Sequence, residues 1–459
     1  MKHRVASRGQ PDQGQEPPQL LSAFDTFAVQ FAVVGIAGSV FSAFRWTLPT
    51  YGPVFFWAWA IGSALQLTVG LSIAEVASAY AVAGSCYSWV RILHSQRLAA
   101  FVGYLLILGY ISAFAGTVYA AVPYMLQLVV VANPTTSQIL IVTILLLLVQ
   151  TAINLLPVQS GIRVNNLRVT VELAAMGVLL VVLLAVGLHS STSILFKAHW
   201  GIHEHIPPVL LLLVGAGTGG IGSFDAAANL AEEIDRPLST VPKSSMLANI
   251  VAALSSTALI GVGLLAISDL NKTTSAALPL AYVMQTRVGI AFANSMEAVM
   301  VVTLCFSGIA LQMSGSRLIW AQARDGVLPR QLSRLSDAHV PAIAIICLAV
   351  IAAGFTLWHA GLEDLSAIGG LAAVLAYGIT VAVSLHSKAN GRLPRDRAWN
   401  LGRWGMINDA VALGWSLLIL AVLPFENLTS MEEGLLLAVV VGVLLYLCME
   451  QTKPRRASA

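Results

Sequence analysis

The sequence predicts an all-α polytopic membrane protein with twelve transmembrane helices. Of its 459 residues, 57% are hydrophobic and only 10% are charged, whereas a soluble domain carries about 25% charged residues. Twelve apolar stretches reach the length of about 20 residues that a bilayer requires. Two of these stretches carry glycines at their centres, where an ordinary spanning helix has few. These observations exclude a string of soluble domains.

The loops between the stretches are short, so no soluble catalytic domain separates the spans. If both termini lie inside, 21 of the 25 Lys and Arg residues fall in the tails and internal loops. The positive-inside rule therefore predicts cytoplasmic termini, in a plasma membrane or a bacterial inner membrane. It also explains the net charge of +3, so the partner is a lipid bilayer and not a nucleic acid. The stretches are centred near residues 34, 65, 114, 147, 178, 218, 256, 307, 350, 374, 415 and 440.

The sixth stretch contains the strongest local signal. Residues 215–222 read GAGTGGIG, with five glycines in eight positions. Each glycine costs a helix about 1 kcal/mol relative to alanine, so we predict a helix that stops and restarts. Interrupted backbone is tolerated at membrane depth where it lines a protein cavity, which is where transporters bind their cargo.

The first stretch is also interrupted by glycines, at Gly35 and Gly38. Paired interruptions in two halves of a chain are typical of inverted repeats. We therefore expect the first five spans, about residues 24–190, to match the next five, about residues 206–388. Helices 11 and 12, about residues 406–450, would be additions. Close helix packing of the GxxxG kind is the alternative explanation for these glycines.

Three segments stand out as motifs: AEVASAYAVAGSCYSWV at 74–90, SFDAAANLAEEIDRPLSTVPKS at 223–244 and GSRLIWAQARDGVLPRQLS at 315–333. They resemble amino acid permeases of the amino acid–polyamine–organocation superfamily, closest to the amino acid/choline/GABA permease branch. The first departs from the family pattern at Ala81 and Ser85, where proline and glycine are usual. The resemblance covers about residues 24–450. It implies a LeuT-type fold, with a 5+5 inverted repeat, broken first and sixth helices, and alternating access.

The domain organisation follows from these patterns. Residues 1–23 are polar and lack the apolar core of a signal peptide, so we expect a disordered cytoplasmic tail. Residues 24–450 form a single transporter domain, and residues 451–459 a second cytoplasmic tail. The four cysteines have no metal-ligand spacing, and the histidines at 203–205 are expected to be wet loop residues. We therefore expect no cofactor and no metal.

Backbone groups at the two breaks are expected to bind the substrate. Amides at the start of the restarted first helix suit a carboxylate, because free N–H groups and the helix dipole favour negative charge. Carbonyls that end the first half of the sixth helix suit a cationic amine. The family places an aromatic over the substrate at Phe224, although packing in the core or against lipid is the alternative. The expected substrate-binding residues are Gly35, Ile36, Ala37, Gly38, Ser39, Thr218, Gly219, Gly220, Ile221 and Phe224.

Two acids inside the spans are candidates for coupling. Asp225 has three competing roles, as a cap of the restarted helix, which we favour, as a contact of the substrate amine, or as a proton carrier. Some relatives carry a lysine near Glu172, where it stands in for a sodium ion. An acid there would instead bind a cation or carry a proton, unless it is a fixed partner of Arg168 one turn earlier. Ser307 is a weaker candidate for a cation site.

Charged residues near the cytoplasmic face are candidates for a gate. The acids Glu75 and Glu232 end the second and sixth helices and are expected to pair with arginines of the ARDG segment, such as Arg324. Such pairs either hold the inward side shut or are permanent structural contacts. Tyr110 and Tyr377 are further candidates for lining the cavity, although aromatic belts explain many such residues.

The sequence thus predicts a secondary active transporter for amino acids or related amines, with proton coupling as the preferred energy source. Sodium coupling, and a GABA or choline permease or an exchanger, are alternatives. A transport-dead nutrient sensor on the same fold is a further one. An enzyme is not expected, because no set of catalytic groups converges at one depth.

Overall fold

The computed structural model describes residues 19–128, 134–199, 207–219, 221–358, 362–394 and 397–422. Within these ranges the chain is helical, and an isolated bridge joins Leu21 to Ile234. Nine of the described helices are long and apolar enough to cross a membrane, and two shorter apolar helices accompany them. The protein is therefore an all-helical polytopic membrane protein. The expected twelfth helix, Gly220, the 203–205 histidines, residues 1–18 and the 451–459 tail lie outside the described residues. The end of the predicted disordered tail is ordered, because Leu21 is buried against Ile234 and α1 begins at Ala23.

The helix bounds follow the apolar stretches of the sequence. The elements up to residue 185 are α1 (Ala23–Val34), α2 (Ile36–Ser42), η1 (Ala43–Thr47), α3 (Leu48–Tyr51), α4 (Phe55–Ala77), α5 (Ser85–Leu93), α6 (Gln96–Leu128), α7 (Thr136–Leu155) and α8 (Val158–Ala185). Those that follow are η2 (Thr192–Phe196), α9 (Pro208–Thr218), η3 (Ala227–Glu233), α10 (Pro237–Leu265), α11 (Leu270–Ser275), α12 (Pro279–Arg287), α13 (Ile290–Arg324), η4 (Arg330–Ser333), α14 (Ala342–Trp358), α15 (Leu362–Ala389), η5 (Gly402–Trp404) and α16 (Gly405–Val422).

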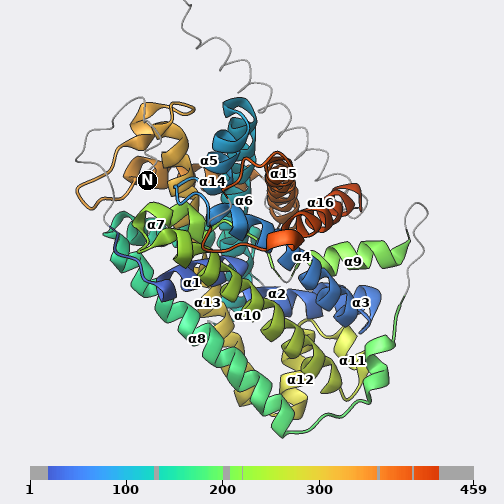
Figure 1. The fold of residues 1–459 in the computed structure, drawn as a ribbon. Helices are drawn as coiled ribbons and strands as arrows, with labels where there is room; N and C mark the ends of the chain where they lie inside the picture. Colours follow the sequence, from blue (N-terminus) through green and yellow to red (C-terminus); the bar gives the residue numbers. More distant parts are fainter. Residues whose placement is uncertain are drawn as a thin grey trace, which may run out of the picture.

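The long helices α6 and α13 form the centre of the bundle. Both bury most of their residues, and α6 packs along α13 and α15. In contrast, α7 and α8 bury a third of their residues or fewer, and α8 runs along the lower edge of the molecule (Figure 1). Exposed leucine, isoleucine and valine side chains on these outer helices suit contact with lipid.

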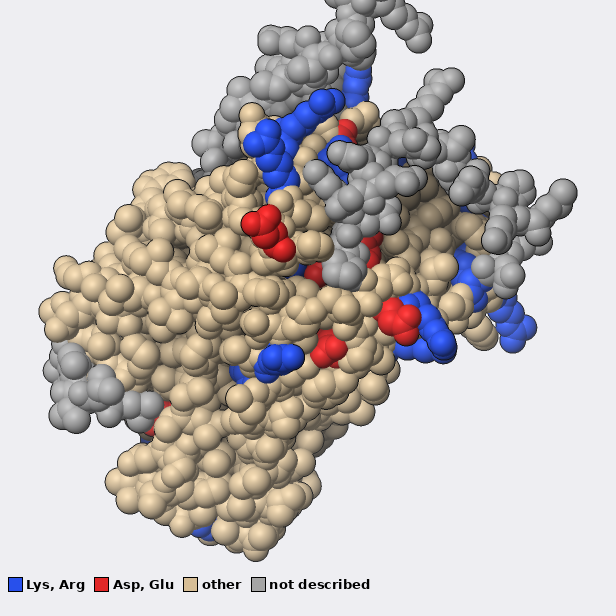
Figure 2. Space-filling model, turned by 90° about the vertical axis from the view of Figure 1, so that its left-hand side faces the viewer, with Lys and Arg blue, Asp and Glu red and all other residues tan. Residues whose placement is uncertain are grey.

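The outer surface separates apolar from charged regions. Figure 2 shows a broad tan area over the lower and left parts of one face, with blue and red side chains gathered mainly above it. Large hydrophobic side chains are exposed on several helices, including Leu167, Val181, Leu254 and Val350. An apolar belt of this kind is what a bilayer-spanning protein needs, because hydrocarbon cannot solvate charge.

Both predicted interruptions are present. The helix α1 ends at Val34, Gly35 adopts a left-handed conformation with φ 62°, and α2 begins at Ile36. Glycine reaches this region without the penalty that a Cβ imposes, which explains its place at the break. The helix α9 ends at Thr218, and the chain is irregular until η3 begins at Ala227.

The glycines at the breaks have two different functions. A Cβ on Gly62 of α4 would lie 2.1 Å from the Gly217 Cα, so these glycines allow α4 and α9 to pack backbone against backbone. A Cβ on Gly38 would lie 2.7 Å from the Leu304 side chain. Gly222, in contrast, faces open space, as does Gly35. Close packing therefore explains Gly38 and Gly217, whereas Gly35 and Gly222 border the space at the breaks.

Candidate functional site

Two adjoining cavities lie at the breaks. The aromatic cavity has a volume of about 410 Å³ and is bordered by Tyr110, Phe224 and Tyr377. The glycine cavity has a volume of about 620 Å³ and is bordered by Gly35 and Gly219, among others. Val34, Gly116 and Thr117 line both, so the two form one continuous region between the interrupted helices. Volumes of this size match those of small-molecule sites.

The break after α1 offers fewer free amides than the sequence predicts. The Ala37 N–H donates to Glu172 Oε1 at 3.0 Å, so this amide already has a carboxylate partner. The Ser39 N–H and hydroxyl both donate to the Gly35 carbonyl, at 3.1 and 3.2 Å. Among the described residues, the Ile36 and Gly38 amides have no recorded acceptor. Gly35, Gly38 and Ser39 line the glycine cavity, whereas the Ile36 side chain is buried in the core.

The break after α9 divides its residues between the cavities. Thr218, Ile221 and Phe224 line the aromatic cavity, and Gly219 lines the glycine cavity. The Phe224 ring meets the Tyr377 ring edge to face, with centroids 5.3 Å apart and planes at 72°. Phe224 thus borders the cavity and packs in the core at the same time, so both interpretations of this residue apply.

Asp225 accepts its hydrogen bonds from side chains. The Ser85 and Tyr377 hydroxyls each donate to its carboxylate at 2.6 Å, the Tyr110 hydroxyl at 3.0 Å and the Asn229 amide at 3.2 Å. A helix cap would accept from backbone amides instead. In the structure Asp225 therefore joins α5, α6, α15 and the restarted sixth span through side chains.

The departure from the family pattern at Ser85 has a structural consequence. Ser85 has φ 42°, in the left-handed region that favours glycine. A non-glycine residue there costs roughly 1–2 kcal/mol, which is why glycine is common at such positions. The serine hydroxyl compensates by donating to Asp225. Ala81 lies in the irregular segment before α5 and makes no contact that explains the missing proline.

Asp225 differs from the other buried acids in having no cationic partner. The other four each lie within 4.0 Å of a lysine or arginine nitrogen, whereas no such contact is found for Asp225 among the described residues. The titratable groups around it are Cys86, Tyr110 and Tyr377, all neutral as ordinary thiol and phenols. The five acids are Glu75, Glu172, Asp225, Glu233 and Asp409.

Arg168 is the central group at the predicted cation site. Its Nη2 lies 3.0 Å from Glu172 Oε2, its Nε donates to the Thr303 carbonyl at 2.7 Å, and its Nη1 donates to the Ala32 carbonyl at 3.4 Å. The guanidinium therefore joins α8 to α1 and α13. Ser307 borders the glycine cavity, where its hydroxyl donates to the Leu304 carbonyl at 2.7 Å.

Acids at the end of the sixth span pair with the ARDG segment. Glu232 makes a bidentate contact with Arg324, at 2.7 and 2.9 Å, and Glu233 pairs with the buried Arg317 at 2.8 Å. Nearby, Arg91 pairs with Asp325 at 3.2 Å. These contacts hold η3 and α5 against the end of α13.

The Tyr87 hydroxyl adds a contact to this group, because it donates to Asp325 at 3.1 Å. Burial, together with the Asp325 carboxylate, raises the pKa of Tyr87 above its ordinary value. The phenol therefore stays protonated as a donor across the physiological range.

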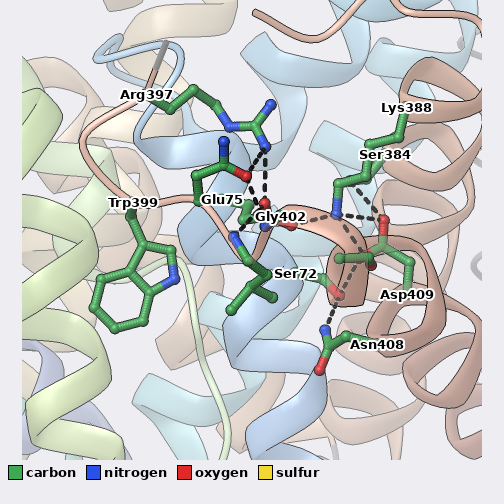
Figure 3. Close-up of polar contacts among 12 residues, drawn as sticks. Ser72, Glu75, Ser384, Lys388, Arg397, Trp399, Gly402, Asn408 and Asp409 are labelled. Carbon is green, nitrogen blue, oxygen red and sulfur yellow. Dashed lines mark hydrogen bonds and ion pairs between the residues drawn. The ribbon is translucent and has the colours of Figure 1, made fainter. Parts of the chain in front are cut away.

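The predicted ARDG partner of Glu75 is wrong. Glu75 Oε2 pairs with Lys388 of α15, and Glu75 Oε1 accepts from Arg397 at 2.8 Å and from the Leu401 amide at 2.9 Å (Figure 3). The physical reason is that the chain after α15 covers the end of α4. It places these donors against the carboxylate, so both Glu75 oxygens are already bonded without the ARDG segment.

Asp409 completes this cluster and was not predicted. Its carboxylate lies 2.7 Å from Lys388 Nζ and accepts from the Ser72 hydroxyl at 2.6 Å and the Ser384 hydroxyl at 3.0 Å. Figure 3 shows these side chains pointing toward one another from α4, α15 and α16. The available signal was an acid at the start of an otherwise apolar stretch. We call Glu75, Lys388, Arg397 and Asp409 the four-charge cluster.

Comparison with known proteins agrees with this architecture. The family model described as amino acid permease matches residues 21–445. The chain is 26% identical to Amino-acid permease 2 of Neurospora crassa over 461 residues, covering 92% of this chain and 81% of that protein. It is 24% identical to Branched-chain amino acid permease BcaP of Lactococcus lactis, covering 70% and 73%. Amino-acid permease BAT1 of Arabidopsis thaliana is 23% identical, with 87% and 84% covered.

The relatives that the chain matches are permeases, which are membrane transporters and not enzymes. The chain belongs to the amino acid permease family, so it is a multi-pass transporter for amino acids.

Proposed function

We propose that the protein is a secondary active transporter that moves amino acids by alternating access. The observation that carries the proposal is the pair of interrupted helices on either side of two adjoining cavities. Interrupted helices at membrane depth are typical of transporter binding sites. The corresponding positions of the breaks also support a LeuT-type 5+5 inverted repeat, with residues 24–450 as one transporter domain of twelve helices.

The substrate's charged groups would bind at the two breaks. The amides of Ile36 and Gly38 would donate to the carboxylate, because Ala37 is already bonded to Glu172. Carbonyls around Thr218 and Ile221 would accept from the amine. Phe224 would cover the bound molecule from the side of the aromatic cavity.

In the orientation that we propose, the glycine cavity opens toward the outer side of the membrane. The glycine cavity extends to Arg45, Trp46 and Tyr124, near the far end of the first span. At the opposite end, the pairs of Arg317 and Arg324 with Glu233 and Glu232 hold the helices together. With cytoplasmic termini, as the positive charges favour, this is an outward-facing arrangement with a closed inner gate.

Proton coupling at Asp225 is the energy source that we propose. Glu172 is held by the Arg168 guanidinium and the Ala37 amide, which favours a permanent charge. Arg168 also supplies a fixed positive charge between α1, α8 and α13, so a sodium ion is not needed there. No such partner lies beside Asp225 among the described residues, so we propose this acid as the one that gains and loses a proton.

Reconstitution into liposomes tests the proposal. Uptake of radiolabelled amino acids, GABA and choline would be measured under an inward proton gradient, an inward sodium gradient and neither. We expect amino acid uptake that the proton gradient stimulates and sodium leaves unchanged. Uptake only against internal substrate would identify an exchanger, and binding without flux would contradict the transporter and favour a sensor.

A further inference from the structure

We propose that the aromatic cavity receives the substrate's side chain, and that Gln66 selects uncharged side chains that carry a hydrogen-bonding group. The inference deepens the proposed function and rests on it, because it assigns the chemical class of amino acid to the same site. It begins from the part of the cavity wall that α4 and α16 form.

The wall of the aromatic cavity carries no charge. Its lining, taken over the described residues, includes no aspartate, glutamate, lysine or arginine. A charged side chain would lose its hydration there without gaining an ionic partner, which disfavours its binding strongly. Asp225 does not change this, because it is fully buried behind Tyr110 and Tyr377, whose hydroxyls it accepts. The substrate's side chain is therefore uncharged.

Gln66 is a buried amide without a protein partner. It lines the aromatic cavity from α4, its relative exposure is 6%, and no hydrogen bond from its side chain is found among the described residues. Three of the other four buried glutamines are bonded to the protein through their amide nitrogen, whereas Gln322 Nε2 has no partner among the described residues and does not line the cavity. Gln30 donates to the Ser223 carbonyl at 2.8 Å, Gln150 to the Cys305 carbonyl at 2.8 Å and Gln312 to Thr151 at 2.9 Å. Gln66 is thus free to bond a ligand.

Of the hydroxyls that line this cavity, Ser112 on α6 has no partner among the described residues, whereas two near Gln66 already donate within their own helices. The Ser416 hydroxyl donates to the Ala412 carbonyl at 2.9 Å, and the Thr218 hydroxyl donates to the Val214 carbonyl at 2.9 Å. Gln66 therefore offers both a free donor and a free acceptor in this part of the cavity.

Apolar residues complete the subsite. Val69, Leu106 and Ile419 line the cavity together with Gln66 and suit the methylene groups of a side chain. A polar group at the end of that side chain would bond the Gln66 amide. An apolar side chain of the same length would leave the buried amide unpaired, and sites of this kind discriminate against the analogue that lacks the polar group. Glutamine fits this description, and methionine is its apolar counterpart of similar length.

Competition for uptake in proteoliposomes tests the inference. Methionine and glutamine are tested separately, and for each we measure the concentration that halves uptake of a radiolabelled substrate. The readout is the value for methionine divided by the value for glutamine. Gln66→Met removes the amide but keeps the length of the side chain. We expect this ratio to fall by about 2- to 10-fold in Gln66→Met, the range of one neutral hydrogen bond. The exposed Gln285→Met is the matched control and should keep the wild-type ratio.

Three outcomes separate the possibilities. An unchanged ratio in a folded Gln66→Met protein that still transports would overturn the inference and leave the proposed function intact. If the wild-type protein takes up no amino acid at all, the proposed function itself is contradicted. If Gln66→Met does not fold, the wild type alone decides, because inhibition by lysine or glutamate as strong as that by glutamine would overturn the uncharged subsite.

Discussion

Asp225 is the residue on which the proposed coupling depends. Its carboxylate is buried, receives two phenol hydroxyls and a serine hydroxyl, and has no cation beside it among the described residues. The two tyrosines also line the aromatic cavity, so the acid and the substrate share neighbours. A change in protonation therefore alters the hydrogen bonds of the cavity wall.

We predict that Asp225→Asn abolishes the stimulation of uptake by an inward proton gradient. The asparagine oxygen still accepts from the tyrosines, so exchange of internal for external substrate should continue. Tyr377→Phe is the control, since it removes one donor and keeps the acid, and it should change KM while keeping the stimulation. Stimulation of Asp225→Asn equal to that of the wild type would contradict the coupling role.

Glu172 gives a different prediction, because it is part of an ion pair. Glu172→Gln leaves the Arg168 guanidinium buried without a counter-charge, and breaking such a pair costs about 3–5 kcal/mol. We expect a lower thermal unfolding temperature in detergent and retained proton stimulation. Combining Glu172→Leu with Arg168→Met should recover most of the loss. A stable Glu172→Gln protein that has lost proton stimulation would transfer the coupling role to Glu172.

Between elements, the two classes of glycine make opposite predictions. Gly62→Ala forces α4 away from α9, because the new Cβ would lie 2.1 Å from the Gly217 Cα. We expect strong destabilisation, of at least the 1–3 kcal/mol typical of overpacking, and reduced yield of folded protein. Gly222→Ala places its methyl group in open space at the cavity, so unfolding should change little while the KM for substrate rises. Equal stability of both variants would contradict the assignment.

The sequence predicts the helices well and the polar partners poorly. Apolar stretches and the glycine runs locate nine helices long enough to span a membrane, two shorter apolar helices and both interruptions, because these properties are local. Glu75 shows the limit, since its partners Lys388 and Arg397 lie more than 300 positions away in the chain and nothing local identifies them. The partners of Asp225 are equally hard to predict from the sequence, because three of its four hydrogen-bond donors come from other elements.

Over the whole molecule, the proposed inner gate depends on the ion pairs at the end of α13. Two interpretations remain, a gate that opens in the transport cycle and a permanent structural contact. Thr117 lines both cavities. To distinguish the two interpretations, a membrane-impermeant thiol reagent is applied from the cytoplasmic side, and the labelling of the cysteine in Thr117→Cys is measured. The native cysteines are first replaced by serine.

If the contacts form a gate, we predict that Arg317→Ala increases cytoplasmic labelling far more than Arg324→Ala. Arg317 pairs with Glu233 in the interior, whereas Arg324 and Glu232 are partly exposed, and exposed pairs contribute only about 0.2–1 kcal/mol. In a double variant that carries Glu232→Arg and Arg324→Glu, the ion pair forms with its charges exchanged. Cytoplasmic labelling of this variant should equal that of the wild type. A structural contact would instead lower stability in Arg317→Ala and leave labelling unchanged.

The pairing of buried charges also determines where the membrane voltage acts. The four-charge cluster has two acids and two bases, so its net charge is zero, and Arg168 with Glu172 is likewise neutral. Movement of such neutral groups across the membrane does little electrical work. A single unpaired charge differs, because moving it through the full potential is worth about 2.3 kcal/mol per 100 mV. Among the described buried acids, Asp225 is the one with no cation beside it, so the proposed coupling at this residue would be the step in the buried core that responds to voltage.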